Sequence, residues 1–406
     1  MPHQTNVRSN SAEHINPPLP DSIPTLGSLF TANGYEAVHF GKTHDMGSLR
    51  GFRHKEPVAK PFTDPEFPVN NDSFLDVGTC EDAVAYLSNP PQEPFICIAD
   101  FQNPHNICGY VGENKGEHID SPISTPLPLL PENFEVEDWE KLPLPIQYIC
   151  CSHRRMMQAA HWNEDNYRHY VAAFQHYTRI VARQIESVLE ALYSTPAGKN
   201  TIVIVLADHG DGMGSHRMVT KQVSFYEEMT NVPFIIAGPG IHPRQKPVED
   251  LLTQPTIDLL PTLCELAGIP VPSSKPGISL APFLQGEKQK RQHPYAASEW
   301  HSEYEVTVSP GRMIRSPRYK YTHYLEGNGE ELYDMLKDKG ERRNLAHDPK
   351  YSKILAEHRA LLDDYIRRTQ DDYRSLKVEA DKRWRSHAPG YPNHEGPCAR
   401  DIINRK

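Results

Sequence analysis

One stretch constrains the fold more than any other: the unbroken apolar run Ile202–Ala207, followed at once by the polar, glycine-rich loop Asp208–Lys221. The run is short and rich in β-branched residues, so it predicts a buried parallel strand. In doubly wound α/β sheets, ligands bind beyond the carboxyl ends of the strands. The glycines of the loop permit a tight, exposed conformation there. Asp208 and His209 could therefore ligate a divalent metal at this sheet edge, and Lys221 could hold an anion.

Two earlier stretches repeat this order of apolar strand and polar loop. Tyr35–Phe40 is predicted to be a strand and runs into Gly41-Lys42-Thr43-His44. A second buried strand is predicted at Phe95–Ala99, and the loop after it ends in Pro104-His105. Because the carboxyl ends of parallel strands meet at one edge of a sheet, we expect these polar side chains to converge with Asp208 on one cavity.

Helices are predicted between and after these strands. Asn163–Tyr193 carries an apolar residue every three or four positions, which predicts a long amphipathic helix whose aromatic stripe packs in the core. Shorter helices are predicted at Pro24–Asn33 and Thr256–Ala267, with a further strand at Val232–Ala237. This alternation predicts an α/β fold, with a mainly parallel sheet and helices on both faces.

Charge and composition exclude several classes of partner. The formal net charge is −10 and no Lys/Arg-rich run occurs, which argues against nucleic acid or an anionic membrane surface. No segment approaches the ~18 consecutive apolar residues of a membrane span. The seven cysteines show no CxxC spacing, so the sequence favours neither a zinc site nor a disulfide framework. No compartment is indicated, because any export signal is expected ahead of Met1.

The loop DHGDGMGSHRMVTK, followed by Tyr226, Glu227, Glu228 and Val232-Pro233, resembles the sulfatase family, a branch of the alkaline-phosphatase-like superfamily. Gly41-Lys42-Thr43-His44 is similar to the family's G-K-W-H, with Thr43 in place of Trp. The Pro-His pair that ends at His105 resembles its P-H-x-P element. The resemblance extends from about residue 1 to about residue 350 and implies hydrolysis of sulfate monoesters, sulfated carbohydrates included.

The resemblance also implies a role for each site residue. Lys42 and Lys221 would contact the sulfate oxygens, while His44 and His105 would serve the nucleophile and the leaving-group oxygen. Asp208 and His209 would hold a divalent metal. Calcium is the family's usual ion, although the histidine makes manganese a better match than in an all-oxygen site. Two further loop residues, Asp211 and His216, could also contribute to the site. The alternative is hydrogen bonding within the loop for Asp211 and an orienting or surface role for His216.

A change of character near residue 290 predicts a second part of the chain. Glu331-Leu332-Tyr333-Asp334 resembles a sulfatase segment, and family members place such a region in a small antiparallel subdomain. Short strands are expected at Tyr295–Glu299 and Val306–Val308, with a final helix at Lys353–Thr369. The predicted domains are therefore 1–289, the α/β domain; 290–376, the α+β subdomain; and 377–406, a polar tail.

The nucleophile of the family is not found in this sequence. Sulfatases carry a C/S-x-P-x-R motif whose Cys or Ser becomes formylglycine, and the nearest match here, Cys151–Arg155, has His where Pro belongs. The family's first strand, which carries two metal-binding aspartates, has no counterpart either. We expect a sulfatase shortened at its N-terminus and inactive as the chain stands.

Other readings of the same residues remain open. The chain could be a non-catalytic receptor for sulfated ligands, or a fragment that does not fold. Within enzymes, a phosphate or phosphonate monoester hydrolase is the alternative, because the same superfamily scaffold serves both reactions. The expected partner in every enzymatic case is a small-molecule or glycan ester.

Overall fold

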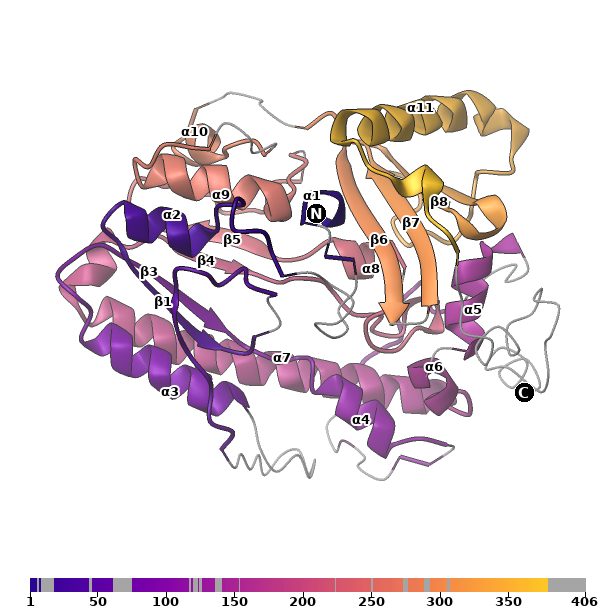
Figure 1. Ribbon diagram of the computed structural model, residues 1–406. Coiled ribbons are helices and arrows are strands. Elements are labelled where there is room, and N and C mark those ends of the chain that lie inside the picture. The colour runs from indigo at the N-terminus through magenta and orange to yellow at the C-terminus, as the bar shows by residue number, and fades with distance from the viewer. Residues whose placement is uncertain are drawn as a thin grey trace.

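The structure is a computed structural model in which the following residues are described: 1–5, 7–8, 18–43, 46–60, 75–116, 118–119, 123, 126–135, 141–152, 154–222, 224–249, 251–272, 277–287, 293–304 and 307–378. Two parts are visible in Figure 1, an α/β part and a four-stranded sheet covered by helix α11. The helices of the described ranges include none long and apolar enough to cross a bilayer.

A parallel sheet brings two of the predicted loops to the same edge. Its order is β2-β1-β3, with β1 at Glu36–Gly41, β2 at Arg53–Lys55 and β3 at Phe95–Asp100. Both pairings are parallel, and Gly41 lies opposite Asp100 in the register. The chain therefore leaves β1 toward Lys42 and leaves β3 toward His105 at one sheet edge.

The strand before the glycine-rich loop differs from its prediction. Strand β4, Val203–Leu206, pairs antiparallel with β5, Phe234–Ala237, and in the described part of the chain neither is hydrogen-bonded to β3. Leu206 is 41% exposed and Ile235 is 59% exposed. The prediction of a buried parallel strand at Ile202–Ala207 is thus wrong in both respects, because β4 has one strand neighbour and borders a large cavity.

Helices cover both faces of the α/β part, as predicted (Figure 1). On one face, α3, Leu75–Ser88, and α7, Glu164–Tyr193, pack against the parallel sheet, with Ala83 and Val188 contacting Val38 and Phe40. On the other, α2, Leu26–Ala32, and α9, Pro255–Leu266, share the cluster that contains Phe30 and Cys264. The fold is therefore the expected α/β arrangement.

Helix α7 is 30 residues long and begins at a well-defined cap. The Asn163 side chain accepts from the Asn166 backbone N–H, and the Asn166 side chain accepts from that of Asn163. Such a cap contributes about 1 kcal/mol. The aromatic stripe is buried, with Tyr167, Tyr170 and Tyr177 fully enclosed in the largest core cluster.

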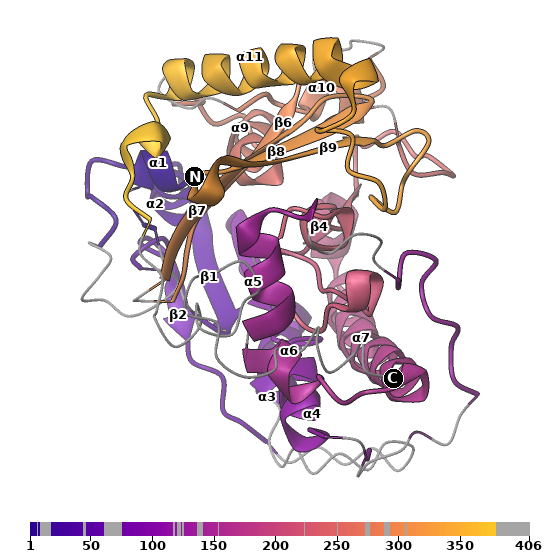
Figure 2. The same ribbon diagram turned by 90° about the vertical axis from the view of Figure 1, so that its right-hand side faces the viewer.

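The second sheet is antiparallel and closed on both faces. Its order is β6-β7-β8-β9, at Ala296–Tyr304, Thr307–Arg315, Tyr319–Tyr324 and Gly329–Asp334. Helix α11, Ser352–Thr369, covers its outer face (Figure 2), where Leu355 and Leu362 pack against Ile314 and Leu332. Strands β6 and β7 are longer than the short strands predicted at Tyr295–Glu299 and Val306–Val308, but the antiparallel subdomain is confirmed.

Short helices complete the described chain. They are α1 Pro2–Thr5, α4 Ile107–Glu113, α5 Leu144–Ser152, α6 Arg154–Gln158, α8 Glu227–Thr230 and α10 Ala281–Leu284. Single 3-10 turns lie at Pro196–Asn200, Ser215–Arg217, Glu326–Asn328, Pro349–Tyr351 and Tyr373–Ser375.

Candidate active site

Lys42 is positioned by a glycine that no other residue could replace without strain. Gly41 ends β1 with φ at +117°, and a Cβ there would lie 2.1 Å from the carbonyl oxygen of Asp100. The backbone N–H of Lys42 then donates to that same oxygen at 3.2 Å. Only glycine tolerates both the conformation and the approach, so the close pairing of β1 and β3 fixes where Lys42 begins.

His105 is positioned by a buried carboxylate on the neighbouring helix. Asp76, in α3, is 1% exposed and accepts backbone N–H bonds from Gln102 at 2.6 Å and Asn103 at 2.9 Å. The backbone N–H of His105 donates to the carbonyl of Gln102 at 2.9 Å. The loop after β3 is therefore anchored on α3, and no local sequence pattern predicts this role of Asp76.

The loop Asp208–Lys221 is held by helix α7. The Tyr170 hydroxyl donates to the Asp211 carboxylate and accepts the backbone N–H of Thr220 at 2.7 Å. Asp211 also accepts the backbone N–H of Met213 at 3.1 Å. Tyr170 thus ties both ends of the loop to the helix, and Asp211 has the hydrogen-bonding role that was one of its two predicted alternatives.

His216 lies inside the protein, which excludes a surface role. It is 3% exposed and stacks on Tyr226, with ring centroids 4.1 Å apart and planes 14° from parallel. Its backbone N–H donates to the Asn133 carbonyl at 2.8 Å. Burial lowers the pKa of His216 to about 4, against the opposing effect of the Glu228 carboxylate. The imidazole is therefore neutral at pH 7 and helps to pack the loop.

Five of the predicted residues line one large cavity between the two parts of the molecule. The cavity has a volume of about 2990 Å³, and its walls include Lys42, His105, Asp208, His209 and Lys221. The effect of their charges on His105 shows that these residues lie close together. Burial lowers the pKa of His105 to about 4, and the positive charges of Lys221 and Lys42 lower it further, while Asp208 opposes them. Three residues distant from His105 in the sequence thus act on its imidazole.

Two of these groups are cations without a counter-ion. Among the described residues, the ammonium groups of Lys42 and Lys221 make no hydrogen bond or ion pair. Both side chains are partly buried. Partly desolvated positive charges in a low-dielectric pocket attract an anion strongly. The arrangement can therefore bind a compact anionic group between the two lysines and beside His105.

Comparison with known proteins identifies the family. The sulfatase family model matches residues 1–269, and the model of the N-sulphoglucosamine sulphohydrolase C-terminal region matches residues 214–368. The chain belongs to the sulfatase family. It is 78% identical over 406 residues to the Delta 4,5-hexuronate-2-O-sulfatase of Bacteroides thetaiotaomicron, covering 100% of this chain and 84% of that protein.

Solved structures agree with this assignment. The sulfatase superposes on a structure described as a 2-O GAG sulfatase with a TM-score of 0.93 and 78% identity, over 99% of this chain and 86% of that one. It also superposes on the phosphonate monoester hydrolase of Agrobacterium radiobacter with a TM-score of 0.69 over 92% and 85% of the two chains. That second match is 18% identical and shows a shared fold alone.

The predicted metal ligands of the sulfatase form a pair. The Asp208 carboxylate lies 3.6 Å from Nε2 of His209, and Nδ1 of His209 faces the Gly210 carbonyl at 2.8 Å. Nδ1 donates to that carbonyl, and Nε2 is the ring nitrogen that faces the carboxylate. The described residues hold no cluster of three or more His, Cys, Asp or Glu suited to a metal. Because Ca²⁺ takes six to eight oxygen ligands, these two residues do not complete a calcium site, and no step below passes through a metal.

Some predicted residues of the sulfatase cannot be placed, and one important residue was missed. His44 lies outside the described residues, and so do the side chains of Cys151 and Ser152. Tyr170 was interpreted as part of an apolar stripe, yet its hydroxyl holds the loop Asp208–Lys221. Periodicity finds the buried face of a helix but does not show which tyrosine hydroxyl meets a partner.

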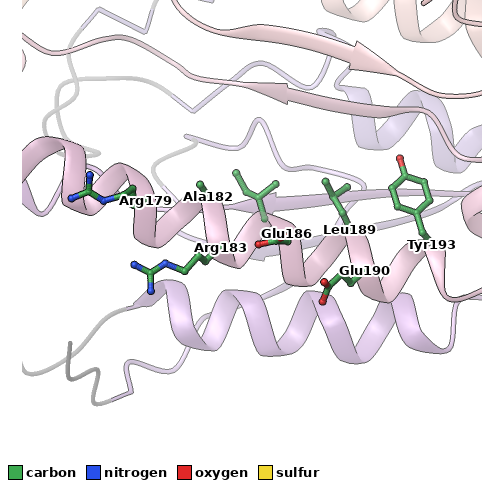
Figure 3. A pocket seen from close by; sticks show the side chains of 8 residues that line it. Arg179, Ala182, Arg183, Glu186, Leu189, Glu190 and Tyr193 are labelled. Atoms are coloured by element: carbon green, nitrogen blue, oxygen red, sulfur yellow. The ribbon is translucent and has the colours of Figure 1, made fainter. Parts of the chain in front are cut away.

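A second hollow lies along α7, and Ile185 and Leu189 line both it and the large cavity. It has a volume of about 630 Å³ and is bordered by one helix, with Arg179, Arg183, Glu186 and Glu190 among its residues (Figure 3). Charges of both signs follow one another along the helix, as is usual for a solvated face. None of the predicted site residues of the sulfatase contributes to this hollow.

Proposed function

We propose that this sulfatase acts on a sulfate monoester of a sulfated carbohydrate, the 2-O-sulfate of a Δ4,5-unsaturated hexuronate in particular. The observation that carries the proposal is the pair of lysine ammonium groups, Lys42 and Lys221, which line the cavity and have no counter-ion within the described part of the chain. The 78% identity to the hexuronate-2-O-sulfatase, over the whole chain, supports the sugar and the ester position.

The roles follow from the chemistry of each side chain. The ammonium groups of Lys42 and Lys221 stabilise the negative charge on the sulfate oxygens, which grows during transfer. As the sulfuryl group passes from the ester oxygen to an attacking nucleophile, the S–O bond breaks and His105 donates a proton to that oxygen, so that the sugar leaves as an alcohol. In the free protein its pKa is about 4, but a bound sulfate places negative charge beside the imidazole and raises that pKa toward neutrality.

These roles are predictions, and so are the assignments of three further residues. His44 is assigned to the nucleophile's oxygens, and Asp208 with His209 to a divalent cation, calcium before manganese. The sulfatase nucleophile has no assigned residue, because positions 1–406 contain no C/S-x-P-x-R motif. The proposal therefore rests on recognition and leaving-group chemistry, and its test measures binding separately from turnover.

The test compares 2-O-sulfated unsaturated uronate disaccharide with its unsulfated form and with a matched phosphate ester, by calorimetry. We expect the sulfated sugar to bind at least roughly a hundredfold more tightly than the unsulfated one. Each of Lys42→Met and Lys221→Met should weaken binding roughly ten- to a hundredfold, because a charged hydrogen bond contributes about 1.5–3 kcal/mol. Lys199→Met, at an exposed position, is the matched control.

Ion chromatography of released sulfate measures turnover in the same samples. Equal affinity for the sulfated and unsulfated sugars would refute the proposal. Preference for the phosphate ester would favour a phosphate or phosphonate hydrolase instead. Tight binding without sulfate release would restrict the chain to recognition.

A further inference from the structure

One histidine at the cavity wall has no part in the proposed function. His301, in β6, lines the cavity and is half-buried. Its imidazole makes no hydrogen bond or ion pair with any described residue. Other histidines of the same subdomain have partners: Nδ1 of His323 faces the Tyr373 hydroxyl at 2.7 Å, and Nε2 of His358 faces the Ser316 hydroxyl at 2.9 Å. The ring of His301 is therefore available to a ligand in the cavity.

His301 lies at an irregular point of an edge strand. Strand β6 ends its sheet, and in the described chain β7 is its only strand neighbour. The pairing shifts around His301, because Trp300 lies opposite Gly311 whereas Ser302 lies opposite Val308. Such β-bulges redirect side chains and are common beside active sites. Trp300 and His301, which would lie on opposite faces of a regular strand, both line the cavity here.

This bulge lies close to the segment that carries Lys221. A Cβ on Gly311 would lie 2.8 Å from the ring of Phe225, so Phe225 packs against β7 beside the pair formed by Gly311 and Trp300. Lys221 precedes Phe225 by four residues, a chain length of at most about 14 Å. A sugar whose sulfate group lies at Lys221 can therefore extend toward β6.

The electrostatic potential at His301 favours an anion. Burial lowers the pKa of His301 to about 4, and the positive charges of Arg8 and of Arg312 in β7 lower it further. The carboxylates of Asp371 and Asp372, which follow α11, oppose them with a smaller effect. Both arginines are paired with these aspartates, yet the remaining potential at the ring is positive. The imidazole is therefore neutral at pH 7, and a negative group beside it would be attracted.

We propose that His301 binds the carboxylate of a uronate substrate and takes up a proton from the solvent as it does so. This inference rests on the proposed function and deepens it, because it names a residue that distinguishes an acidic sugar from a neutral one. A carboxylate beside the ring offsets the local positive charge and accepts its N–H, and both effects favour the imidazolium form. Binding of the acidic sugar is thereby coupled to pH.

Calorimetry across a range of pH compares two ligands: the 2-O-sulfated unsaturated uronate disaccharide and its counterpart with the carboxylate reduced to a primary alcohol. In the wild-type chain the uronate should bind more tightly, and the ratio of the two affinities should rise by up to roughly tenfold per pH unit from pH 7 to pH 5. Titrations at pH 6 in two buffers of different ionisation enthalpy should show more proton uptake with the uronate. Proton uptake by His105 in response to the sulfate is common to both ligands and cancels.

Two variants assign the effect to this residue. His301→Gln can still donate a hydrogen bond but cannot take up a proton, so the affinity ratio should become independent of pH and the extra proton uptake should disappear. His301→Lys supplies a permanent cation, so the preference for the uronate should persist at pH 7 without the pH dependence. His347→Gln is the matched control, because His347 is exposed and does not line the cavity.

The remaining outcomes separate this inference from the proposed function. A uronate preference whose pH dependence survives in His301→Gln would overturn the inference. If His301→Gln weakens both ligands equally and lowers the melting temperature, His301 is structural and the inference fails. If the wild-type chain binds the two sulfated ligands equally, or with a ratio that does not change with pH, the inference fails while the sulfate-ester function stands. Binding of neither ligand would refute the proposed function itself.

Discussion

Lysines in the two parts of the molecule have opposite surroundings. Lys320, in β8, is 1% exposed, and its ammonium group lies 2.7 Å from the Phe225 carbonyl and 2.9 Å from each of the Glu227 and Glu341 carboxylates. Lys42 and Lys221 are partly exposed at the cavity and have no such partner among the described residues. The first cation is enclosed by two carboxylates and a carbonyl of the protein itself, whereas the other two are placed to attract an external anion.

This difference follows from how each part is built. The C-terminal sheet has all four strands paired and both faces covered, so a buried charge there must be neutralised by the protein itself. The α/β part is divided into two sheets that border a cavity, so its strand ends deliver charges to an open space. The C-terminal sheet thus contributes mainly to stability, and the α/β part mainly to binding. Variants on either side test that division.

The largest effect is expected from Lys320→Met, on stability. The variant leaves Glu341 buried opposite Glu227 without the cation that both face, and removing one partner of a buried ion pair costs about 3–5 kcal/mol. We expect about 3 kcal/mol at pH 7, the low end of that range. The reason is that burial already raises the pKa of Glu341 to about 8, so its carboxyl group can take up a proton.

Urea denaturation measures this loss, with Lys339→Met as the control at an exposed position. Without Lys320 the pKa of Glu341 should rise further. The folded variant then binds a proton that the unfolded chain releases, so its stability should fall as pH rises above the unfolded value, 4.5 for a glutamate. A cost below about 1 kcal/mol would show that the closed sheet does not depend on internal neutralisation.

An intermediate effect, on affinity for the sulfated sugar, is expected from Tyr170→Phe. This variant changes the attachment of the loop Asp208–Lys221 to α7. The variant leaves the Asp211 carboxylate and the Thr220 N–H without the hydroxyl that joins them. Unsatisfied buried groups cost about 1–3 kcal/mol, part of which the loop recovers by moving. Because Thr220 precedes Lys221, affinity for the sulfated sugar should fall roughly tenfold, or about 1.4 kcal/mol.

Calorimetry with the sulfated disaccharide checks this, and Tyr193→Phe on an exposed turn of α7 serves as the control. Unchanged affinity together with lower stability would mean that the loop keeps Lys221 in place without Tyr170. The position of Lys221 at the cavity would then not depend on the attachment of the loop to the buried face of α7.

The sequence predicted the elements better than their pairing. Periodicity located α7 within one residue, because a buried face repeats every turn. The apolar run at Ile202–Ala207 did not reveal that β4 pairs with β5 alone, since one strand's composition does not show its neighbours. Motif order brought Lys42, His105 and Lys221 to one cavity, but the residues that hold them, Asp76 and Tyr170, gave no local signal.

The smallest effect is expected on stability, from lowering the pH. It concerns His216, which lies where the two halves of the molecule contact each other. His216, in the loop, stacks on Tyr226, whose hydroxyl donates to Glu331 of β9 at 3.1 Å. Burial lowers the pKa of His216 to about 4 in the folded state, against 6.5 when unfolded. Between these values the unfolded chain binds the extra proton, so stability is fully present above pH 6.5 and is lost as pH falls toward 4. We expect His216 to account for about 1 kcal/mol of the loss between pH 7 and pH 5.5.

Other buried histidines shift in the same direction, so the informative quantity is the difference in slope between wild type and His216→Asn. His105 and His301 also have pKa values lowered to about 4 by burial, and both are retained in the variant. The variant will be less stable at every pH because it loses the ring stacking, but its free energy of unfolding should fall less steeply between pH 7 and pH 5. Parallel slopes would mean that water reaches His216 in the folded protein. The contact between the two halves at His216 would then be as accessible to water as the cavity. The boundary between the solvent-accessible half and the closed half would instead lie at Tyr226 and β9.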